Sequence, residues 1–423
     1  MNVYFSGLGG VGIGPLAEIA RDAGINVIGS DLTESLVTSE LREQGIIVNI
    51  GQDGTFLQKS HAETPFDWFV YTAALPEDHP ELVLAKKLGI RTGKRDEFLA
   101  EFIQEHNLKL IAVAGTHGKT TTTGMAVWAF KQLGIPVSYS IGTTVSFGSS
   151  GAYDPDSSYF VYECDEYDKN FLHFHPNISL ITSVDYDHPD SYPTEKSYFD
   201  AFNQFIEQSK LVICWNKDID LDTLGKYNLL HLIDQDKKDL SFIHLAGLHN
   251  RQNAFLVFTL LVDHLGFAGR EEEVLRAVES FPGTDRRFEK LADNIYSDYG
   301  HHPEEIAATL QMAREVSDDV VLVYQPHQNW RQHFIRDQYT NQFELASKVY
   351  WAPTYLTREN PDQPILTSEE LTQNITNKNA ITYSELNDGV WDDVLKARDN
   401  GSLILFMGAG TIDQWVREKL NAR

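Results

Sequence analysis

Hydrophobic positions along the chain follow two patterns that alternate from one end to the other. Short runs of consecutive apolar residues predict buried strands, and stretches in which apolar positions recur every three or four residues predict helices. The predicted strands are Val3–Phe5, Asn26–Ile28, Trp68–Tyr71, Leu108–Ala114, Tyr159–Glu163, Ile178–Val184, Leu211–Trp215, Val320–Tyr324, Val349–Pro353 and Leu403–Met407. Helices are predicted between them, among them Arg251–Leu265 and Glu271–Ser280. This alternation is typical of α/β proteins built on parallel sheets.

Two interruptions of the pattern predict domain boundaries. The polar stretch 104–107 precedes a fresh strand, and Phe281-Pro282-Gly283-Thr284 ends the helical pattern of the middle third. We therefore expect α/β domains over residues 1–107, 108–282 and 283–423. The expected fold is an N-terminal Rossmann-like domain, a central phosphate-loop (P-loop) ATPase domain with a mostly parallel sheet, and a C-terminal Rossmann-like α/β domain.

The composition narrows the possible partners and the compartment. Lys and Arg number 35 and Asp and Glu 61, which gives a formal net charge of −26. Nucleic acids and anionic membranes bind cationic surfaces, so we expect neither as a partner. The two cysteines, Cys164 and Cys214, are too few for a disulfide framework and indicate a cytoplasmic protein. The N-terminus has no basic segment typical of a signal peptide, and no apolar stretch approaches the length of a membrane span.

A first glycine motif lies near the N-terminus. Gly7-Leu8-Gly9-Gly10-Val11-Gly12 follows a predicted strand and opens a helix, and Asp31 ends the next strand. Such glycines let the backbone approach phosphates at a helix N-terminus, and the acid contacts a ribose. The motif does not identify the nucleotide, and a glycine turn that only packs a helix on a strand remains the alternative.

A second glycine motif has the context of a phosphate loop. The strand that ends at Ala114 continues into Gly115-Thr116-His117-Gly118-Lys119-Thr120-Thr121-Thr122, and a helix follows. Backbone N–H groups of such a loop surround phosphates, the lysine reaches the β and γ oxygens, and the first threonine hydroxyl binds Mg²⁺. The loop is a shortened one, because Val113 stands where the long form has glycine. A turn without function is the alternative.

Acidic and histidine residues follow two strands of the same domain. Glu163-Cys164-Asp165-Glu166 ends one strand, and Asp185-Tyr186-Asp187-His188-Pro189-Asp190 follows the next. Carboxylates at the carboxyl edge of a parallel sheet, beside a phosphate loop, suit Mg²⁺ because this ion prefers hard oxygen ligands. The alternatives are a solvated acidic loop and, for His188, a simple turn residue.

Four further segments carry residues typical of binding sites. They are His244-Leu245-Ala246-Gly247-Leu248-His249-Asn250, Arg286-Arg287, Asp298-Tyr299-Gly300-His301-His302-Pro303-Glu304-Glu305, and Gln325-Pro326-His327 with Arg331 beyond it. Paired arginines can bind an anion, and adjacent histidines before a helix indicate a site. A helix cap at Asn250, a solvated basic pair and tandem surface histidines are the alternatives.

Taken together, these motifs resemble the Mur ligase family. The motifs, which occur in the family's order and cover nearly the whole chain, are Gly-Thr-His-Gly-Lys-Thr, Glu-Cys-Asp-Glu, Asp-His-Pro-Asp, Gly-Leu-His-Asn-Arg-Gln-Asn-Ala, Arg-Arg-Phe and Asp-Tyr-Gly-His-His-Pro-Glu-Glu-Ile. The resemblance implies a UDP-sugar-binding N-terminal domain, an ATP-binding central domain and an amino-acid-binding C-terminal domain. It also implies an ATP- and Mg²⁺-dependent ligase that joins UDP-N-acetylmuramate to a small amino acid through an acyl phosphate, with L-alanine expected and another amino acid or a recycled peptide as the alternative.

The resemblance also implies roles for individual residues. Lys119, Glu163 and His188 would be catalytic, and Thr120, Glu163 and His188 would bind Mg²⁺. ATP would contact Gly115, Thr116, His117, Gly118, Lys119, Thr120, Thr121, His249, Asn250, Asn253, Arg286 and Asp298. The UDP-sugar would contact Gly7, Gly9, Gly10, Val11, Gly12, Ser30, Asp31, Thr72 and Ala73. The amino acid would contact Tyr299, His301, His302, His327 and Arg331.

One departure from the family pattern concerns the incoming amino acid. Gln328 stands where the alanine-adding branch has an arginine after Gln-Pro-His, so a cation near the expected substrate carboxylate is missing. Arg358 is the residue we expect to replace it. Two alternatives lie outside the family, a nicotinamide-dependent oxidoreductase and a non-catalytic scaffold. The first leaves Lys119 and Glu163 unexplained, and the second gives no chemical reason to retain them.

Overall fold

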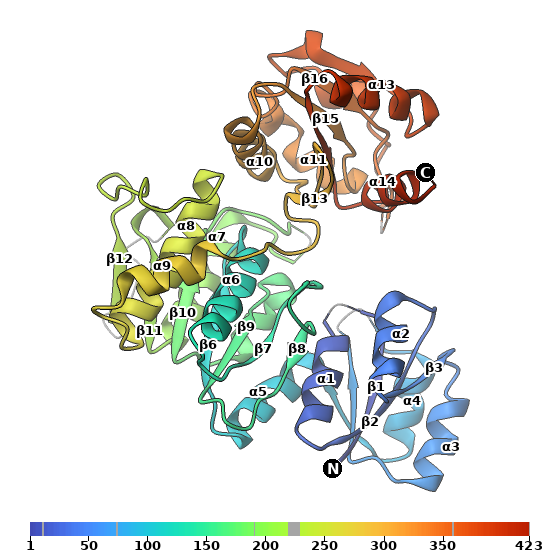
Figure 1. The fold of residues 1–423 in the computed structure, drawn as a ribbon. Coiled ribbons are helices and arrows are strands. Elements are labelled where there is room, and N and C mark those ends of the chain that lie inside the picture. The colour runs from blue at the N-terminus through green and yellow to red at the C-terminus, as the bar shows by residue number, and fades with distance from the viewer. Residues whose placement is uncertain (11, 73–74, 190, 219–228, 358, 423) are drawn as a thin grey trace. The chain divides into compact units, whose positions relative to one another are not determined.

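The computed structural model describes residues 1–422 except 11, 73–74, 190, 219–228 and 358, and it divides the chain into two compact units (Figure 1). The first unit comprises Met1–Phe242 and Asn253–Pro282, and the second comprises Ile243–Gln252 and Gly283–Arg423. The short segment 243–252 therefore belongs with the C-terminal residues, although the sequence places it inside the central domain. It is held there by Arg251, which makes hydrogen bonds of 2.8 and 3.0 Å to Glu315.

The first sheet of unit one is parallel throughout, with strand order β3-β2-β1-β4-β5. Its strands are β1 (Asn2–Ser6), β2 (Asn26–Asp31), β3 (Ile47–Ile50), β4 (Trp68–Tyr71) and β5 (Arg91–Lys94). Its helices are α1 (Gly14–Asp22), α2 (Leu36–Glu43), α3 (Thr55–Glu63), α4 (Pro80–Lys87) and α5 (Arg95–Glu105). The strand order reverses between β1 and β4, and in such sheets ligands bind outside the carboxyl ends of the strands at this switch point.

The second sheet of unit one has the order β12-β11-β10-β6-β9-β7-β8, and only the β7–β8 pair is antiparallel among its described strands. The strands are β6 (Lys109–Ala114), β7 (Ser138–Ser140), β8 (Gly151–Ala152), β9 (Tyr159–Glu163), β10 (Ile178–Ile181), β11 (Leu211–Trp215) and β12 (Leu229–Ile233). The helices are α6 (Lys119–Gln132), α7 (Glu195–Gln208), α8 (Leu248–Thr259) and α9 (Glu271–Glu279), together with 3₁₀ helices η1 (Tyr167–His173) and η2 (Asn216–Asp218) and the π-helix η3 (Leu260–His264).

One hydrophobic core joins the two sheets of unit one. Phe5 of β1, Phe98 and Phe102 of α5, Phe160 of β9 and Phe202 of α7 all belong to a single cluster of buried side chains. Because apolar contact is continuous from one sheet to the other, these two parts of the chain form one compact unit.

Unit two contains a six-stranded sheet with the order β13-β14-β18-β15-β16-β17, antiparallel only between β13 and β14. The strands are β13 (Glu289–Ala292), β14 (Ile295–Asp298), β15 (Val320–Tyr324), β16 (Lys348–Trp351), β17 (Ile381–Tyr383) and β18 (Leu403–Met407). The helices are α10 (Pro303–Val316), α11 (Asn329–Ile335), α12 (Ser368–Thr372), α13 (Asp388–Asp399) and α14 (Ile412–Asn421), with 3₁₀ helices η4 (Arg336–Tyr339) and η5 (Lys378–Ala380). Separate apolar clusters cover the two faces of this sheet, as expected when helices pack on both sides.

The predicted strands are confirmed, and two of them end earlier than predicted. The strand predicted over Val349–Pro353 ends at Trp351 as β16. The strand predicted over Ile178–Val184 ends at Ile181 as β10. Beyond that point the backbone bonds to the phosphate loop instead: the Thr182 N–H donates to the Ala114 carbonyl at 2.9 Å, and the Thr116 N–H donates to the Ser183 carbonyl at 2.9 Å.

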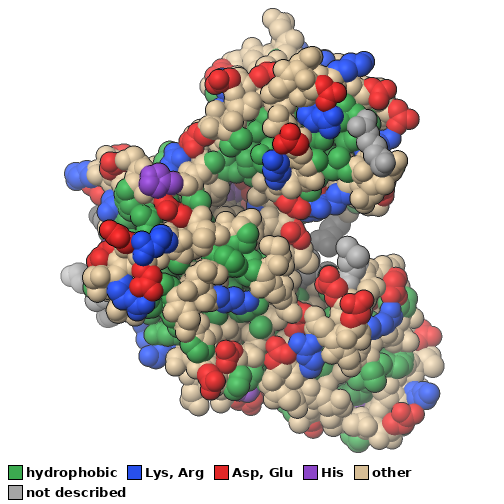
Figure 2. Space-filling model, viewed as in Figure 1, with side chains coloured by type: hydrophobic (Ala, Val, Ile, Leu, Met, Phe, Trp, Pro, Cys, Tyr) green, Lys and Arg blue, Asp and Glu red, His purple; other side chains and the backbone are tan. Residues whose placement is uncertain are grey.

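The side of the protein drawn in Figure 2 carries charged side chains of both signs. Figure 2 shows acidic and basic side chains interspersed over the visible surface of both units, with no broad basic patch in view. Among the described residues, no helix has the length and apolar character needed to cross a membrane.

Candidate functional site

The phosphate loop lies between β6 and α6, as its sequence predicts. Gly118 precedes the first turn of α6 with φ of 84°, a left-handed conformation that favours glycine. A Cβ atom added there would lie 2.9 Å from the side-chain oxygen of Asn253. Gly118 is therefore required both by the backbone conformation and by the close approach of α8. The structure thus places Asn253, a predicted ATP contact, beside this loop.

Lys119 is held inside the loop by an ion pair. Its Nζ atom lies 2.7 and 3.0 Å from the two carboxylate oxygens of Glu166 and donates to the Gly115 carbonyl at 2.6 Å. Glu166 is fully buried. Burial alone would raise the pKa of Glu166, but the Lys119 ammonium, assisted by His188, outweighs it and holds that pKa below its usual value. Burial opposes the charge on Lys119 too, and Glu166 with Asp165 raises its pKa nevertheless.

Thr120 and Glu163 form a hydrogen-bonded pair beside Lys119. The Thr120 hydroxyl donates to Glu163 Oε1 at 2.8 Å, and the backbone N–H of Gly142 donates to Glu163 Oε2 at 2.8 Å. Glu163 is the last residue of β9, next to β6 in the sheet, so both side chains lie at the carboxyl edge. Hydroxyl and carboxylate oxygens are donors that fit Mg²⁺. Among the described residues no group of three His, Cys, Asp or Glu side chains is arranged to bind a metal by itself.

His188 lies on the Glu166 side of this site. Its Nε2 is 3.6 Å from Glu166 and 3.7 Å from Asp187, and its backbone φ is 56°. His117 of the phosphate loop contacts Asp185 at 3.7 Å from the same segment. Residues 182–188 therefore line the loop, as the prediction of a shared sheet edge requires.

Backbone N–H groups of the first glycine motif donate hydrogen bonds to the end of β2. The N–H groups of Gly7 and Leu8 donate to the Ser30 carbonyl at 2.8 and 3.0 Å, and the Gly9 N–H donates to Asp31 at 2.7 Å. A Cβ atom on Gly12 would lie 1.7 Å from an Arg95 guanidinium nitrogen. The glycines thus bring α1 close to β2 and make room for Arg95. Val11 and Ala73, two predicted UDP-sugar contacts, lie outside the described residues.

The Arg95 guanidinium lies beside Gly12 of the first glycine motif and also contacts Asp165, which follows β9. Its guanidinium lies 3.5 Å from Asp96 and 3.5 Å from Asp165, and its Nε is buried without a hydrogen-bond partner among the described residues. Burial opposes the charge, but Tyr162, Asp96 and Asp165 raise the pKa of Arg95.

In unit two, the predicted amino-acid residues gather around His301. Arg331 Nη1 lies 3.0 Å from His301 Nε2, and the His301 and His327 rings are 5.6 Å apart. Tyr355, which the sequence analysis missed, stacks on His327 at 5.6 Å. Burial first, and then Arg331, lowers the pKa of His327 to about 4. This group can present the Arg331 guanidinium and the neutral imidazole of His327 to a ligand.

Other predicted residues of unit two have structural partners. Asp298 accepts hydrogen bonds from the N–H groups of Phe288 and Gly300, each at 2.7 Å, and burial raises its pKa. Arg286 lies over the Tyr299 ring at 4.7 Å. His302 caps α10.

The departure at Gln328 is visible in the backbone. Gln328 has φ of 60°, and the two N–H groups that follow it, of Asn329 and Trp330, donate to Glu359 at 3.0 Å each. The chain's own carboxylate therefore fills this turn. Arg358, the expected replacement cation, lies outside the described residues.

Comparison with known proteins agrees with these motifs along the whole chain. The Mur ligase family catalytic domain matches residues 2–107, the Mur ligase middle domain matches 113–227, and the Mur ligase glutamate ligase domain matches 286–410. The UDP-N-acetylmuramate–L-alanine ligase of Caldicellulosiruptor saccharolyticus is 30% identical, with 98% of each chain aligned. That of Nocardioides sp. is 31% identical over 97% of this chain and 93% of its own. The chain belongs to the Mur ligase family.

Solved Mur ligases share the fold. The UDP-N-acetylmuramate–alanine ligase of Thermotoga maritima superposes with a TM-score of 0.75 at 25% identity, covering 100% of both chains. The murein peptide ligase of Psychrobacter arcticus superposes with a TM-score of 0.66 at 23% identity, covering 100% of this chain and 98% of its own. The three-domain α/β architecture expected from the sequence is thus confirmed.

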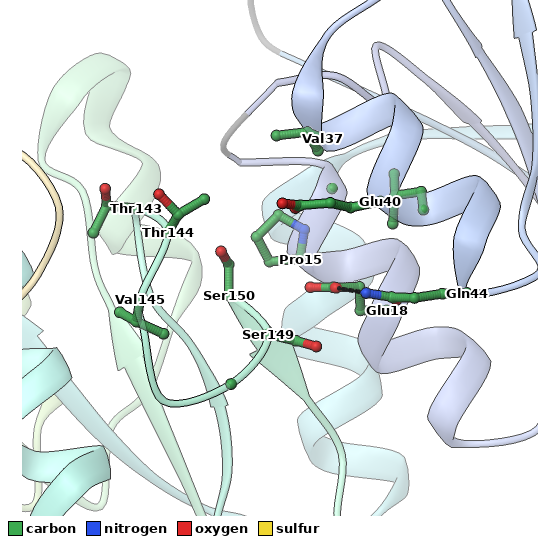
Figure 3. A pocket seen from close by; sticks show the side chains of 13 residues that line it. Pro15, Glu18, Val37, Glu40, Gln44, Thr143, Thr144, Val145, Ser149 and Ser150 are labelled. Carbon is green, nitrogen blue, oxygen red and sulfur yellow. Dashed lines mark hydrogen bonds between the residues drawn. The ribbon is translucent and has the colours of Figure 1, made fainter. Parts of the chain in front are cut away.

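This Mur ligase also has a cavity that the motifs do not predict. It has a volume of about 240 Å³ and lies between α1, α2 and the loop 143–150 (Figure 3). Glu18 is its buried acid, accepting hydrogen bonds from Gln44 at 2.8 Å and from the Gly151 N–H at 3.1 Å, and burial raises its pKa. Glu18 therefore ties α1 to β8 within unit one.

Proposed function

We propose that this Mur ligase is a cytoplasmic UDP-N-acetylmuramate–L-alanine ligase that forms an amide in peptidoglycan precursor synthesis. The observation that carries the proposal is the group formed by Lys119, Thr120, Glu163 and Glu166 at one sheet edge, in a chain that aligns over nearly its full length with ligases of that name. In the proposed reaction ATP transfers its γ-phosphoryl group to the lactyl carboxylate, and the amine of L-alanine displaces phosphate from the acyl phosphate. The products are the amide, ADP and phosphate.

The residues of unit one suit phosphoryl transfer. Lys119 already carries a proton and is positioned by Glu166, so it can neutralise charge on a migrating phosphoryl group without reorganising. Thr120 and Glu163 would hold Mg²⁺, which supplies charge neutralisation at the phosphate oxygens. His188, which lies 3.6 Å from Glu166, would bind or position Mg²⁺ in the same site.

We assign the remaining sites by domain. Residues 1–107 would bind the UDP-sugar through the segment around Gly7 and Asp31, and residues 108–282 would bind ATP. Residues 283–423 would bind the amino acid through His301, His327 and Arg331. We also assign His249, Asn250, Asn253, Arg286 and Asp298 to the binding of ATP.

A direct assay tests the proposal. The protein is incubated with ATP, Mg²⁺, UDP-N-acetylmuramate and one amine at a time, and phosphate release is measured. Release with L-alanine is expected, and release only with a recycled tripeptide would overturn the choice of substrate. No release with any amine would overturn the proposal.

Substitution of Glu163 tests whether this carboxylate takes part in turnover as a metal ligand. Glu163→Gln keeps the size of the side chain but weakens a hard-oxygen ligand, so we expect turnover to fall by about 100-fold or more, on the scale of losing one transition-state contact. Glu207→Gln, in α7, is the matched control and should leave turnover unchanged. Turnover that survives in the Glu163 variant would refute the assigned metal ligands.

A further inference from the structure

A buried carboxylate in the first sheet has no role in the mechanism above. Glu81, in α4, is fully buried, and it accepts hydrogen bonds from Tyr4 at 2.6 Å, Ser6 at 2.7 Å and Ser30 at 2.7 Å. No Lys, Arg or His forms an ion pair with it among the described residues. Removing a carboxylate from water without a cation costs stability, and the three hydroxyl groups that donate to Glu81, together with its place in the first turn of α4, offset part of that cost.

These bonds determine which way the neighbouring hydroxyl groups point. A serine hydroxyl has one proton, and the hydroxyl groups of Ser6 and Ser30 both donate that proton to Glu81 Oε2. Toward any further partner these two oxygens can only accept. Gln52 is that partner: its Nε2 lies 3.0 Å from the Ser6 oxygen and 3.2 Å from the Ser30 oxygen.

The orientation of the Gln52 amide follows from this network. Its NH₂ group must face the serines, because its carbonyl oxygen would meet two oxygens that have no proton to give. The carbonyl oxygen Oε1 is then turned away from the serines, and it has no hydrogen-bond partner among the described residues. Gln52 is half-buried, so this acceptor is reachable.

The acceptor lies where a ligand of this sheet binds. Ser6 and Ser30 stand at the carboxyl ends of β1 and β2, and Ser6 directly precedes Gly7 of the glycine motif. The loop that carries Gln52 is tied to the same edge, because the Gly51 N–H donates to the Asp31 carbonyl at 2.8 Å. Ligands of open α/β sheets bind outside the carboxyl ends of the strands at the switch point, and β1, which ends at Ser6, borders that point beside β4.

We propose that Gln52 selects uracil, accepting a hydrogen bond from the N3–H of the base, and that Glu81 is the positioning residue that fixes its amide. An acceptor of fixed direction discriminates only against a partner whose polarity is also fixed. A ribose hydroxyl can donate or accept, so it gains nothing from this arrangement. Uracil N3 is a donor and cytosine N3 is an acceptor, so the arrangement separates uridine from cytidine nucleotides.

This inference rests on the proposed function, which brings a UDP-sugar to the first domain. Titration calorimetry of the full chain with UDP and with CDP tests it. The wild type should bind UDP at least about tenfold more tightly than CDP, the value of one good hydrogen bond with its unpaired alternative. Gln52→Leu should weaken UDP binding and reduce the preference for UDP over CDP to less than about threefold. Gln58→Leu, an exposed glutamine of α3, should behave as the wild type.

The ratio of the affinities for UDP and CDP also tests the role of Glu81. Glu81→Gln introduces an amide that can donate to the serines, so Gln52 is free to rotate and the preference for UDP over CDP should fall while ADP affinity holds. If that variant does not fold, Ser30→Ala removes one of the two acceptors that hold Gln52 and should lower the same ratio.

The outcomes separate the inference from the proposed function. A wild type that binds UDP and CDP equally, or a Gln52→Leu variant that keeps the preference for UDP, would overturn the inference and leave the ligase assignment intact. A wild type that does not bind UDP or UDP-N-acetylmuramate would overturn the proposed function itself.

Discussion

The ion pair inside the phosphate loop has a measurable consequence for stability. Glu166 is fully buried, and Lys119 contacts both of its oxygens, at 2.7 and 3.0 Å. Lys119→Met keeps most of the side-chain volume but leaves the Glu166 carboxylate buried without the ammonium. Among the described residues, His188 at 3.6 Å is then the remaining ion-pair partner of Glu166. Breaking a buried pair in this way typically costs about 3–5 kcal/mol in the free energy of unfolding.

A double-mutant cycle isolates that cost. Adding Glu166→Gln to Lys119→Met removes the stranded charge, so the double variant should recover at least about 2 kcal/mol relative to Lys119→Met. Urea unfolding followed by circular dichroism measures the shift of the transition. Lys131→Met is the matched control: it lies in the same helix, its ammonium contacts the Tyr139 hydroxyl at 3.0 Å, and it has no carboxylate partner among the described residues.

Two results would refute this reasoning. If Lys119→Met and Lys131→Met destabilise the protein equally, the ion pair contributes nothing beyond ordinary side-chain packing. If Glu166→Gln fails to rescue Lys119→Met, the cost of the single variant does not come from a stranded carboxylate.

Two further predictions concern the pH dependence of stability and the backbone of the phosphate loop. Burial lowers the pKa of His249 and of His327 to about 4, so from about pH 6.5 down to 4 the unfolded chain binds more protons and stability falls, by up to about 1.4 kcal/mol per pH unit for each histidine. Urea midpoints between pH 4.5 and 7 should show this slope, and a His249→Asn/His327→Asn variant that kept the full slope would contradict it. Gly118→Ala should lose about 2 kcal/mol or more, because φ is 84° and the new Cβ would meet Asn253. Gly134→Ala, with φ of 67° and open space around it, should lose only about 1 kcal/mol, and equal thermal shifts would rule out the contact.

Strand prediction succeeded where burial acts on both faces of a strand. Leu403–Met407 is fully apolar and lies in the middle of its sheet, so its sequence and its environment agree. Ile47–Ile50 forms the edge strand β3 and was not predicted, because two of its four residues face solvent. An edge strand owes its conformation to hydrogen bonds with its neighbour, and those bonds leave no periodic pattern in the sequence.

The residues of the candidate site also differ in how far the sequence predicted them. The motif around Lys119 and Thr120 needs only a strand, a turn and a helix in succession, so local sequence predicted it. Glu163 followed from a second strand end beside it. Partners brought together from distant positions had no local signal: Glu166 was part of a quoted motif without an assigned role, and Arg95 and Tyr355 were missed.

By itself, the sequence determined the α/β class, the phosphate loop and the family, because each depends on residues that are close together along the chain. Only the tertiary structure decided that the first two sheets share one core and that residues 243–252 pack with the C-terminal unit. It also decided the hydrogen-bond geometry around Glu81, whose partners Ser6 and Ser30 lie 75 and 51 positions away. Hydrogen bonds of fixed direction between such distant side chains exist only after the chain has folded. That is why the direction in which Gln52 faces its ligand is a property of the fold.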